Sequence, residues 1–214
     1  MTTIAQIRHL HVGYRRNPDV LVDFDLDLEP TELVAVTGPS GRGKSSLLYA
    51  IGGLLRPRGG SIWIGGVDIA SASERHRAAI RAAHCGFVFQ DALLDPSRRV
   101  ITSVTEVGLY RRRSRRQLRQ TARDLLASLG VGHLANVRPG QMSGGQAQRV
   151  AVARALVGGP RIVLADEPTG NLDLESGRLV IDALRSYARA ANACVVFATH
   201  DPNVVANVDR EVRL

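Results

Sequence analysis

The sequence predicts an α/β domain with a parallel central sheet, an N-terminal antiparallel β subdomain and an inserted α-helical subdomain. Three observations carry this prediction. Short apolar runs typical of buried strands alternate with stretches of helical composition. The early part of the chain instead holds short apolar segments divided by turn signals. A long, arginine-rich segment with helical spacing separates two of the buried strands, which indicates an insertion.

The length of 214 residues fits one domain. We expect a single domain over 1–214, with approximately 1–90 and 158–214 forming the core with its β subdomain. Approximately 91–157 would then form the helical subdomain.

The N-terminal part predicts two hairpins. Apolar positions recur through residues 4–28, and Asn17, Pro18 and Asp19 form a turn signal within them. Residues 61–64 and 67–69 flank a Gly-Gly pair and predict the second hairpin. Tyr14 precedes the first turn, where an aromatic packs more often than it binds a ligand.

A glycine-rich loop follows the apolar run 33–37 and precedes a helical stretch. It has the pattern G-x-x-x-x-G-K-[ST] and consists of Gly38, Pro39, Ser40, Gly41, Arg42, Gly43, Lys44 and Ser45, followed by Ser46. One interpretation is an ordinary glycine-rich turn between a strand and a helix, without a binding function. The flanks, however, are those of a phosphate-binding P-loop, in which Lys44 reaches the β- and γ-phosphates and Ser45 contacts Mg²⁺. Lys44 is the only lysine in the chain, which favours a site that needs a compact ammonium.

Polar residues follow three later buried runs, at the strand ends where open α/β sheets bind ligands. Gln90 follows the first, Asp166 and Glu167 end the second, and His200 follows the third. Asp166 is placed to hold Mg²⁺ through water, and Glu167 to polarise an attacking water as a general base. His200 is either incidental or a contact to the γ-phosphate.

A second candidate anion site lies before the helix that begins near residue 147. Ser143, Gly144, Gly145 and Gln146 contain an S-x-x-Q capping box, which explains Ser143 structurally. The same geometry exposes backbone N–H groups and a helix dipole end to an anion.

Charge, cysteine content and hydrophobicity limit the possible partners and cellular location of the protein. A net charge of +8 is compatible with nucleic acid or an anionic membrane face as a partner. However, six arginines within 111–119 supply much of the excess positive charge. That run is either a solvated helix face or a contact to acidic protein or lipid. Cys85 and Cys194 lie in apolar runs, which predicts that they are reduced residues of the core. The N-terminus lacks signal-peptide features, and no apolar stretch approaches the ~20 residues of a membrane span.

Taken in order, these motifs resemble the nucleotide-binding domain of ABC transporters over almost the full length. The family's Walker A motif matches 38–45, its Q-loop glutamine Gln90, and its signature 143–146. Walker B with Asp166 and Glu167, a D-loop with Asp173 and a switch histidine at His200 follow in the family's order. Tyr14 falls where this family stacks an aromatic on adenine.

The resemblance implies an ATPase that uses ATP and Mg²⁺ and pairs with a second copy of itself head to tail. Ser143, Gly144, Gly145 and Gln146 would then act on the ATP held by the other copy. Glu167 would position water, His200 would hold that water and the γ-phosphate, and Gln90 would contact Mg²⁺. The helical subdomain would grip an integral membrane permease, which places the chain in the cytoplasm, peripheral on the inner face of the cell membrane.

Residues 165–173 (ADEPTGNLD) most resemble the lipoprotein-release, macrolide-export and cell-division branch. Residues 94–99 differ from that branch and are similar to peptide-importer cassettes. After His200 the chain is short, and we expect it to lack the usual final strand pair. Two alternative functions share the motifs: a regulatory ATPase that signals through a membrane partner without transport, and a nucleic-acid- or ribosome-associated ATPase. We expect no nucleic acid, because the chain lacks the second cassette, coiled-coil insertions and zinc cysteines of such relatives.

Overall fold

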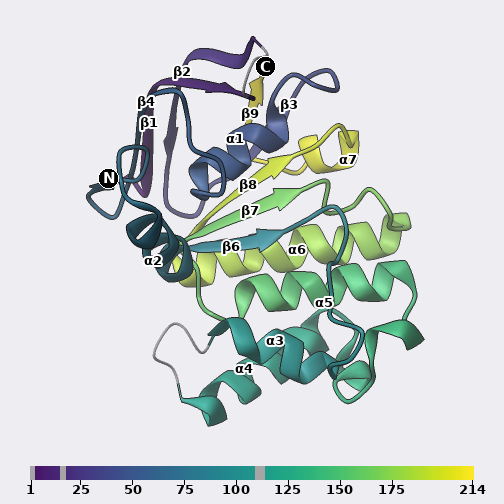
Figure 1. Ribbon diagram of the computed structural model, residues 1–214. Coiled ribbons are helices and arrows are strands. Elements are labelled where there is room, and N and C mark those ends of the chain that lie inside the picture. The colour runs from purple at the N-terminus through teal and green to yellow at the C-terminus, as the bar shows by residue number, and fades with distance from the viewer. Residues whose placement is uncertain (1–2, 15–17, 109–113) are drawn as a thin grey trace.

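The computed structural model describes residues 3–14, 18–108 and 114–214. Asn17 of the first turn and three arginines of the basic run, 111–113, lie outside these ranges. Two sheets organise the fold (Figure 1). The antiparallel sheet has the order β2-β1-β4-β5, and the parallel sheet has the order β6-β7-β8-β3-β9.

The predicted hairpins form the antiparallel sheet, in which β1 pairs with both β2 and β4. Register shifts interrupt both pairings of β1, as β-bulges do. The strands of this sheet are β1 (Ala5–Gly13), β2 (Asp19–Leu28), β4 (Gly59–Ile64) and β5 (Val67–Asp68).

The central strands of the parallel sheet are buried on both faces, as is typical of parallel sheets, whereas the edge strand β9 is partly exposed. Along β7, Ile162 and Leu164 pack toward the antiparallel sheet and α1 (Lys44–Ile51), while Val163 and Ala165 pack toward the helices on the opposite side. The strands of this sheet are β3 (Leu33–Thr37), β6 (Cys85–Val88), β7 (Ile162–Asp166), β8 (Cys194–Ala198) and β9 (Arg210–Arg213).

The sequence predicts that the usual final strand pair after His200 is missing. The structure has one strand in that segment, β9, which pairs parallel with β3 and places Val36 opposite Val212. Asp209 helps to place β9, because its Oδ2 accepts a hydrogen bond of 2.8 Å from the Leu33 backbone N–H.

The helices form layers around the parallel sheet. Figure 1 shows α5 and α6 along one face, with α3 and α4 beyond them at the bottom of the view. Leu118, Ala122 and Leu126 of α4 are buried at the predicted spacing. The remaining helices are α2 (Glu74–His84), α3 (Val100–Gly108), α4 (Arg115–Ser128), α5 (Gly144–Leu156), α6 (Leu174–Ala191) and α7 (Pro202–Val205), with 3₁₀ turns at Gly132–Leu134 and Pro139–Gln141.

Both cysteines are buried and reduced, as the sequence predicted. Within the described ranges, no helix is long and apolar enough to span a bilayer.

Candidate functional site

The glycine-rich loop joins the end of β3 to the start of α1. Gly38, Gly41 and Gly43 have φ angles of 138°, 80° and 95°, which residues with a Cβ rarely adopt. The Lys44 Nζ donates to the carbonyl oxygens of Gly38, at 2.8 Å, and Pro39, at 3.1 Å. The loop therefore curls around a single ammonium group, with α1 directing its N-terminal end toward the same space.

Asp166 ends β7 next to this loop. Its carboxylate is 6% exposed and accepts two hydrogen bonds, from Ser45 Oγ to Oδ1 at 2.9 Å and from the Tyr49 hydroxyl to Oδ2 at 3.0 Å. No lysine, arginine or histidine side chain of the described residues forms an ion pair with it. A buried carboxylate beside a hydroxyl, without a cationic side chain, is a donor set that suits a hard cation such as Mg²⁺.

Sequence reasoning missed Tyr49. Burial, and then the hydrogen bond to Asp166, raise the pKa of Tyr49 to about 12, so its hydroxyl remains a donor at neutral pH. The available signal was its spacing, because Ser45 and Tyr49 are four residues apart and share one face of α1.

Glu167 lies one residue beyond Asp166 in a strained backbone conformation. Its φ is 44°, in the left-handed region that costs a non-glycine residue about 1–3 kcal/mol and that clusters at functional sites. The carboxylate accepts from Thr199 Oγ1 at 3.1 Å through Oε2, and its Oε1 lies 2.6 Å from His200 Nδ1. The Glu167 side chain is 14% exposed, whereas that of His200 is 80% exposed. A sheltered carboxylate is thus connected to an imidazole that reaches solvent.

Two further residues flank this centre. Thr199, which sequence analysis did not single out, is fully buried and also accepts a hydrogen bond from the Asp201 backbone N–H. Burial opposes ionisation of Asp201, but hydrogen bonds from Asn203 and Thr169 outweigh it and lower its pKa. Asp201 also caps α7, so the residues on both sides of His200 are fixed by hydrogen bonds.

Tyr14 lies near the start of α1. Its hydroxyl is 2.8 Å from Ser46 Oγ, and the residue is 46% exposed. The ring therefore flanks the glycine-rich loop with a surface open to solvent. The structure brings together Tyr14, the loop, Asp166, Glu167 and His200.

Among the described residues, neither Ser143 nor Gln90 forms a hydrogen bond with this cluster. In the part of the chain that the structure describes, the Ser143 hydroxyl accepts from the Gln146 backbone N–H at 3.2 Å, and Gln146 Oε1 accepts from Ser143 N at 3.0 Å. This capping box begins α5, and Ser143 and Gly144 are exposed. Gln90 is also exposed and follows Phe89, whose carbonyl accepts from Gln148 Nε2 on α5 at 2.9 Å.

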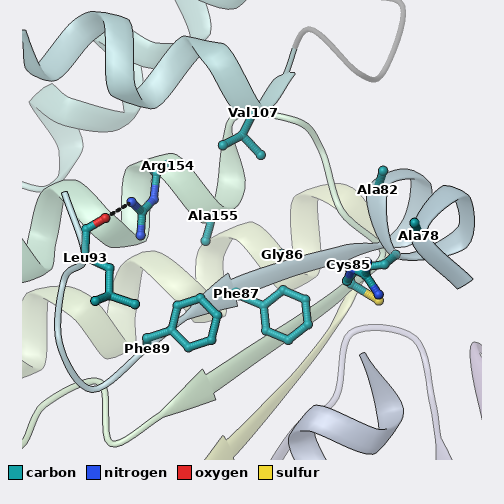
Figure 2. A pocket seen from close by; sticks show the side chains of 11 residues that line it. Ala78, Ala82, Cys85, Gly86, Phe87, Phe89, Leu93, Val107, Arg154 and Ala155 are labelled. Carbon is teal, nitrogen blue, oxygen red and sulfur yellow. Dashed lines mark hydrogen bonds between the residues drawn. The ribbon is translucent and has the colours of Figure 1, made fainter. Parts of the chain in front are cut away.

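A cavity of about 630 Å³ lies beside Phe89, the residue that precedes Gln90. Figure 2 shows Phe87, Phe89, Leu93 and Val107 around it. Arg154 lines it too and donates to the carbonyls of Leu93 and Ala92, both at 2.8 Å. Burial lowers the pKa of Arg154. The lining is chiefly apolar and comes from α2, β6, the loop that follows β6, α3 and α5.

The family model for ABC transporters matches residues 21–170, which is more than half of the chain. The chain belongs to the ABC transporter family. Proteins of this family are ATPases, so the chain is an ATP-binding cassette, and the resemblance drawn from its motifs is confirmed.

Curated relatives of this ABC cassette belong to the predicted branch. It is 44% identical to the lipoprotein-releasing system ATP-binding protein LolD of Granulibacter bethesdensis over 91% of this chain and 85% of that protein. A LolD 2 protein of Caulobacter vibrioides is 45% identical over 91% of this chain and 86% of that one. The macrolide export ATP-binding/permease protein MacB of Rhodopseudomonas palustris is 44% identical, but the cassette spans only 30% of it.

Solved structures confirm the fold. The dimeric, post-hydrolysis ATP-binding cassette MJ0796, bound to ADP and Pi, superposes with a TM-score of 0.91 at 32% identity, covering 98% of this chain and 94% of that one. The cassette cbiO1 of Clostridium perfringens, part of a cbiONQ transporter complex, superposes with a TM-score of 0.87 at 26% identity, over the whole of this chain and 85% of that one.

Proposed function

We propose that this chain hydrolyses ATP at sites shared by two copies of itself and so powers a separate integral membrane permease. The observation that carries the proposal is the convergence of Lys44, Ser45, Asp166, Glu167 and His200 at the carboxyl ends of β3, β7 and β8. A glycine-rich loop, a buried carboxylate and a second carboxylate joined to histidine are the parts that phosphoryl transfer to water needs.

ATP is the substrate, and the loop is its phosphate site. Backbone N–H groups of the loop bind the phosphate oxygens, and Lys44 exchanges its two carbonyl partners for the β- and γ-phosphates. Tyr14 provides an exposed ring on which adenine stacks.

Ser45, Gln90 and Asp166 would hold Mg²⁺, for which the unpaired Asp166 carboxylate and adjacent Ser45 hydroxyl are suited. When bound, the ion neutralises charge that develops on the phosphate oxygens.

Glu167 is the general base of the proposal. Its Oε1 and Oε2 are oriented by His200 and Thr199, so the carboxylate is fixed before a water molecule arrives. His200 is largely exposed and is free to move from Glu167 toward the γ-phosphate and the attacking water.

The signature residues Ser143, Gly144, Gly145 and Gln146 act on the partner copy in this proposal. Ser143 and Gly144 are exposed, and the start of α5 offers the positive end of a helix dipole to an anion. A head-to-tail pair would present that helix end to the ATP on the partner's loop. The neighbouring cassette MJ0796 was solved as a dimer.

The permease is proposed to dock at the cavity beside Gln90. Its apolar lining, including Phe87, Phe89 and Leu93, suits the apolar side chains of a short cytoplasmic segment. Leu93, Val107, Arg154 and Ala155 of that lining belong to the helical subdomain proposed at approximately 91–157, and the other lining residues lie within 78–89, so the cavity is formed by residues of both parts. Two of the relatives are named as ATP-binding components of lipoprotein-releasing systems, which supports a separate permease and a location at the inner face of the cell membrane.

The concentration dependence of turnover tests the shared site. The specific ATPase activity of the purified chain is expected to rise with protein concentration, because a monomer holds only half of each site. Constant specific activity in a preparation shown by light scattering to be monomeric would contradict the proposal. Co-purification with the membrane protein encoded beside this chain tests the permease arm.

A further inference from the structure

Tyr49 connects the buried aspartate to the rest of the site. Its hydroxyl donates to Asp166 Oδ2 at 3.0 Å, while Ser45 donates to Oδ1 at 2.9 Å. Because each carboxylate oxygen has one donor, the plane of the carboxylate is fixed by two side chains on one face of α1. Without Tyr49, Oδ2 loses its one side-chain donor among the described residues.

The Tyr49 ring extends the contact toward Gln90. Its centroid lies 6.3 Å from that of Phe89, with the planes tilted by 51°, and Phe89 stacks on Phe87 at 5.5 Å with an interplanar angle of 5°. Gln148 of α5 holds the Phe89 carbonyl at 2.9 Å. Phe89 is therefore in contact with α5 through its backbone and with Tyr49 through its ring.

We propose that Tyr49 is a positioning residue, which orients the Asp166 carboxylate for Mg²⁺ and makes that orientation depend on the place of Phe89. The inference rests on the proposed role of Asp166 as a Mg²⁺ ligand. Phe87 and Phe89 also line the cavity of about 630 Å³ (Figure 2), so a segment seated there contacts the same stack.

The expected effect follows from the hydrogen bond. Groups that hydrogen-bond to metal ligands typically contribute about 10–100-fold to metal affinity. Tyr49→Phe removes the hydroxyl and retains the ring. We therefore expect the Mg²⁺ concentration that gives half-maximal binding of an ATP analogue to rise about tenfold. Phe89→Leu removes the ring contact and leaves the hydroxyl in place.

The experiment measures nucleotide binding without turnover. A fluorescent, non-hydrolysable ATP analogue is titrated into the full chain at a series of Mg²⁺ concentrations and again in EDTA. The variants are Tyr49→Phe, Phe89→Leu, both together, Asp166→Asn and the matched control Tyr187→Phe. Tyr187 also donates a phenolic hydrogen bond, to the Pro160 carbonyl at 2.7 Å, but it lies on α6 away from Asp166.

We expect Tyr49→Phe to raise the Mg²⁺ concentration needed for half-maximal nucleotide binding about tenfold and to leave the nucleotide affinity in EDTA unchanged. The control Tyr187→Phe should leave the Mg²⁺ dependence unchanged. Phe89→Leu should shift it in the same direction, and the double variant should shift it less than the product of the two. If Tyr49→Phe lowered the affinity for the nucleotide analogue equally in Mg²⁺ and in EDTA, Tyr49 would have a merely structural role and the inference would be overturned. An unshifted Tyr49→Phe, or a double variant that equals the product, would also overturn it.

Asp166→Asn separates the inference from the function on which it rests. If it abolishes the Mg²⁺ dependence while Tyr49→Phe does nothing, the inference alone is wrong. If Asp166→Asn leaves the Mg²⁺ dependence intact, both the assignment of Asp166 and the role of Tyr49 are overturned.

Discussion

Replacement of Glu167 by glutamine isolates the charge of the proposed general base. Glutamine has nearly the same shape, and its amide preserves both neighbours: the carbonyl oxygen accepts from Thr199, and the NH₂ donates to Nδ1 of neutral His200. The variant should therefore fold normally. Among the described residues, the side-chain hydrogen bonds of Glu167 go to Thr199 and His200 and not to Lys44 or the loop, so ATP affinity should stay within a few-fold of wild type.

The expected loss concerns the chemical step. General-base catalysis contributes about 10²–10⁴-fold, so turnover should fall by that factor, which corresponds to about 3–5 kcal/mol in the barrier. Phosphate release under saturating ATP measures turnover, and a fluorescent ATP analogue measures affinity. Glu175→Gln, at an exposed position in the first turn of α6, is the matched control. Turnover within tenfold of wild type for Glu167→Gln would refute the assignment.

Three further predictions concern the loop, the core and a cap. Lys44→Arg should weaken ATP binding by about tenfold or more in a direct titration, because a forked guanidinium does not fit where the ammonium bridges two loop carbonyls. Gly52→Ala should lower the free energy of unfolding in urea by about 1–3 kcal/mol, because its Cβ would overlap the Phe87 ring and lie 2.9 Å from Leu164 Cδ1. Asp173→Ala should cost about 1 kcal/mol by the same measurement, since Asp173 caps α6, whereas Asp173→Asn should cost less. Hydrogen bonds from the Ser176 backbone N–H and hydroxyl lower the pKa of Asp173, so its ionised form stabilises the fold above the unfolded pKa; the gap between wild type and Asp173→Asn should close as the pH falls below about 4.

The centre of the site was predictable because its residues follow strands. Asp166 comes directly after a continuous apolar run and His200 two positions after another, and the carboxyl ends of parallel strands share one edge of a sheet. The loop around Lys44 was predictable because its glycines sit between an obvious strand and an obvious helix. Local patterns therefore located these parts without knowledge of any long-range contact.

Long-range pairings were not predictable in the same way. Tyr49 and Asp166 are 117 positions apart, and nothing local to Tyr49 marks its partner. The β9 strand, Arg210–Arg213, has only one valine among charged residues, so its identity depends on pairing with β3 rather than on its own composition. Glu167 precedes Pro168, which normally favours an extended backbone, yet its φ is 44°. Tertiary contacts with Ala198 and Thr199 override that local preference.

The most direct test of the central claim is to mix two variants that are each inactive. Ser143→Asp keeps a good helix cap but puts a carboxylate where the partner's phosphate must bind, and Glu167→Gln removes the general base. If each site combines Ser143 of one copy with Glu167 of the other, an equal mixture should regain about a quarter of the wild-type ATPase activity, because half of the dimers then hold one intact site of two. A mixture that stays as inactive as either variant alone, although the two copies associate, would contradict the account.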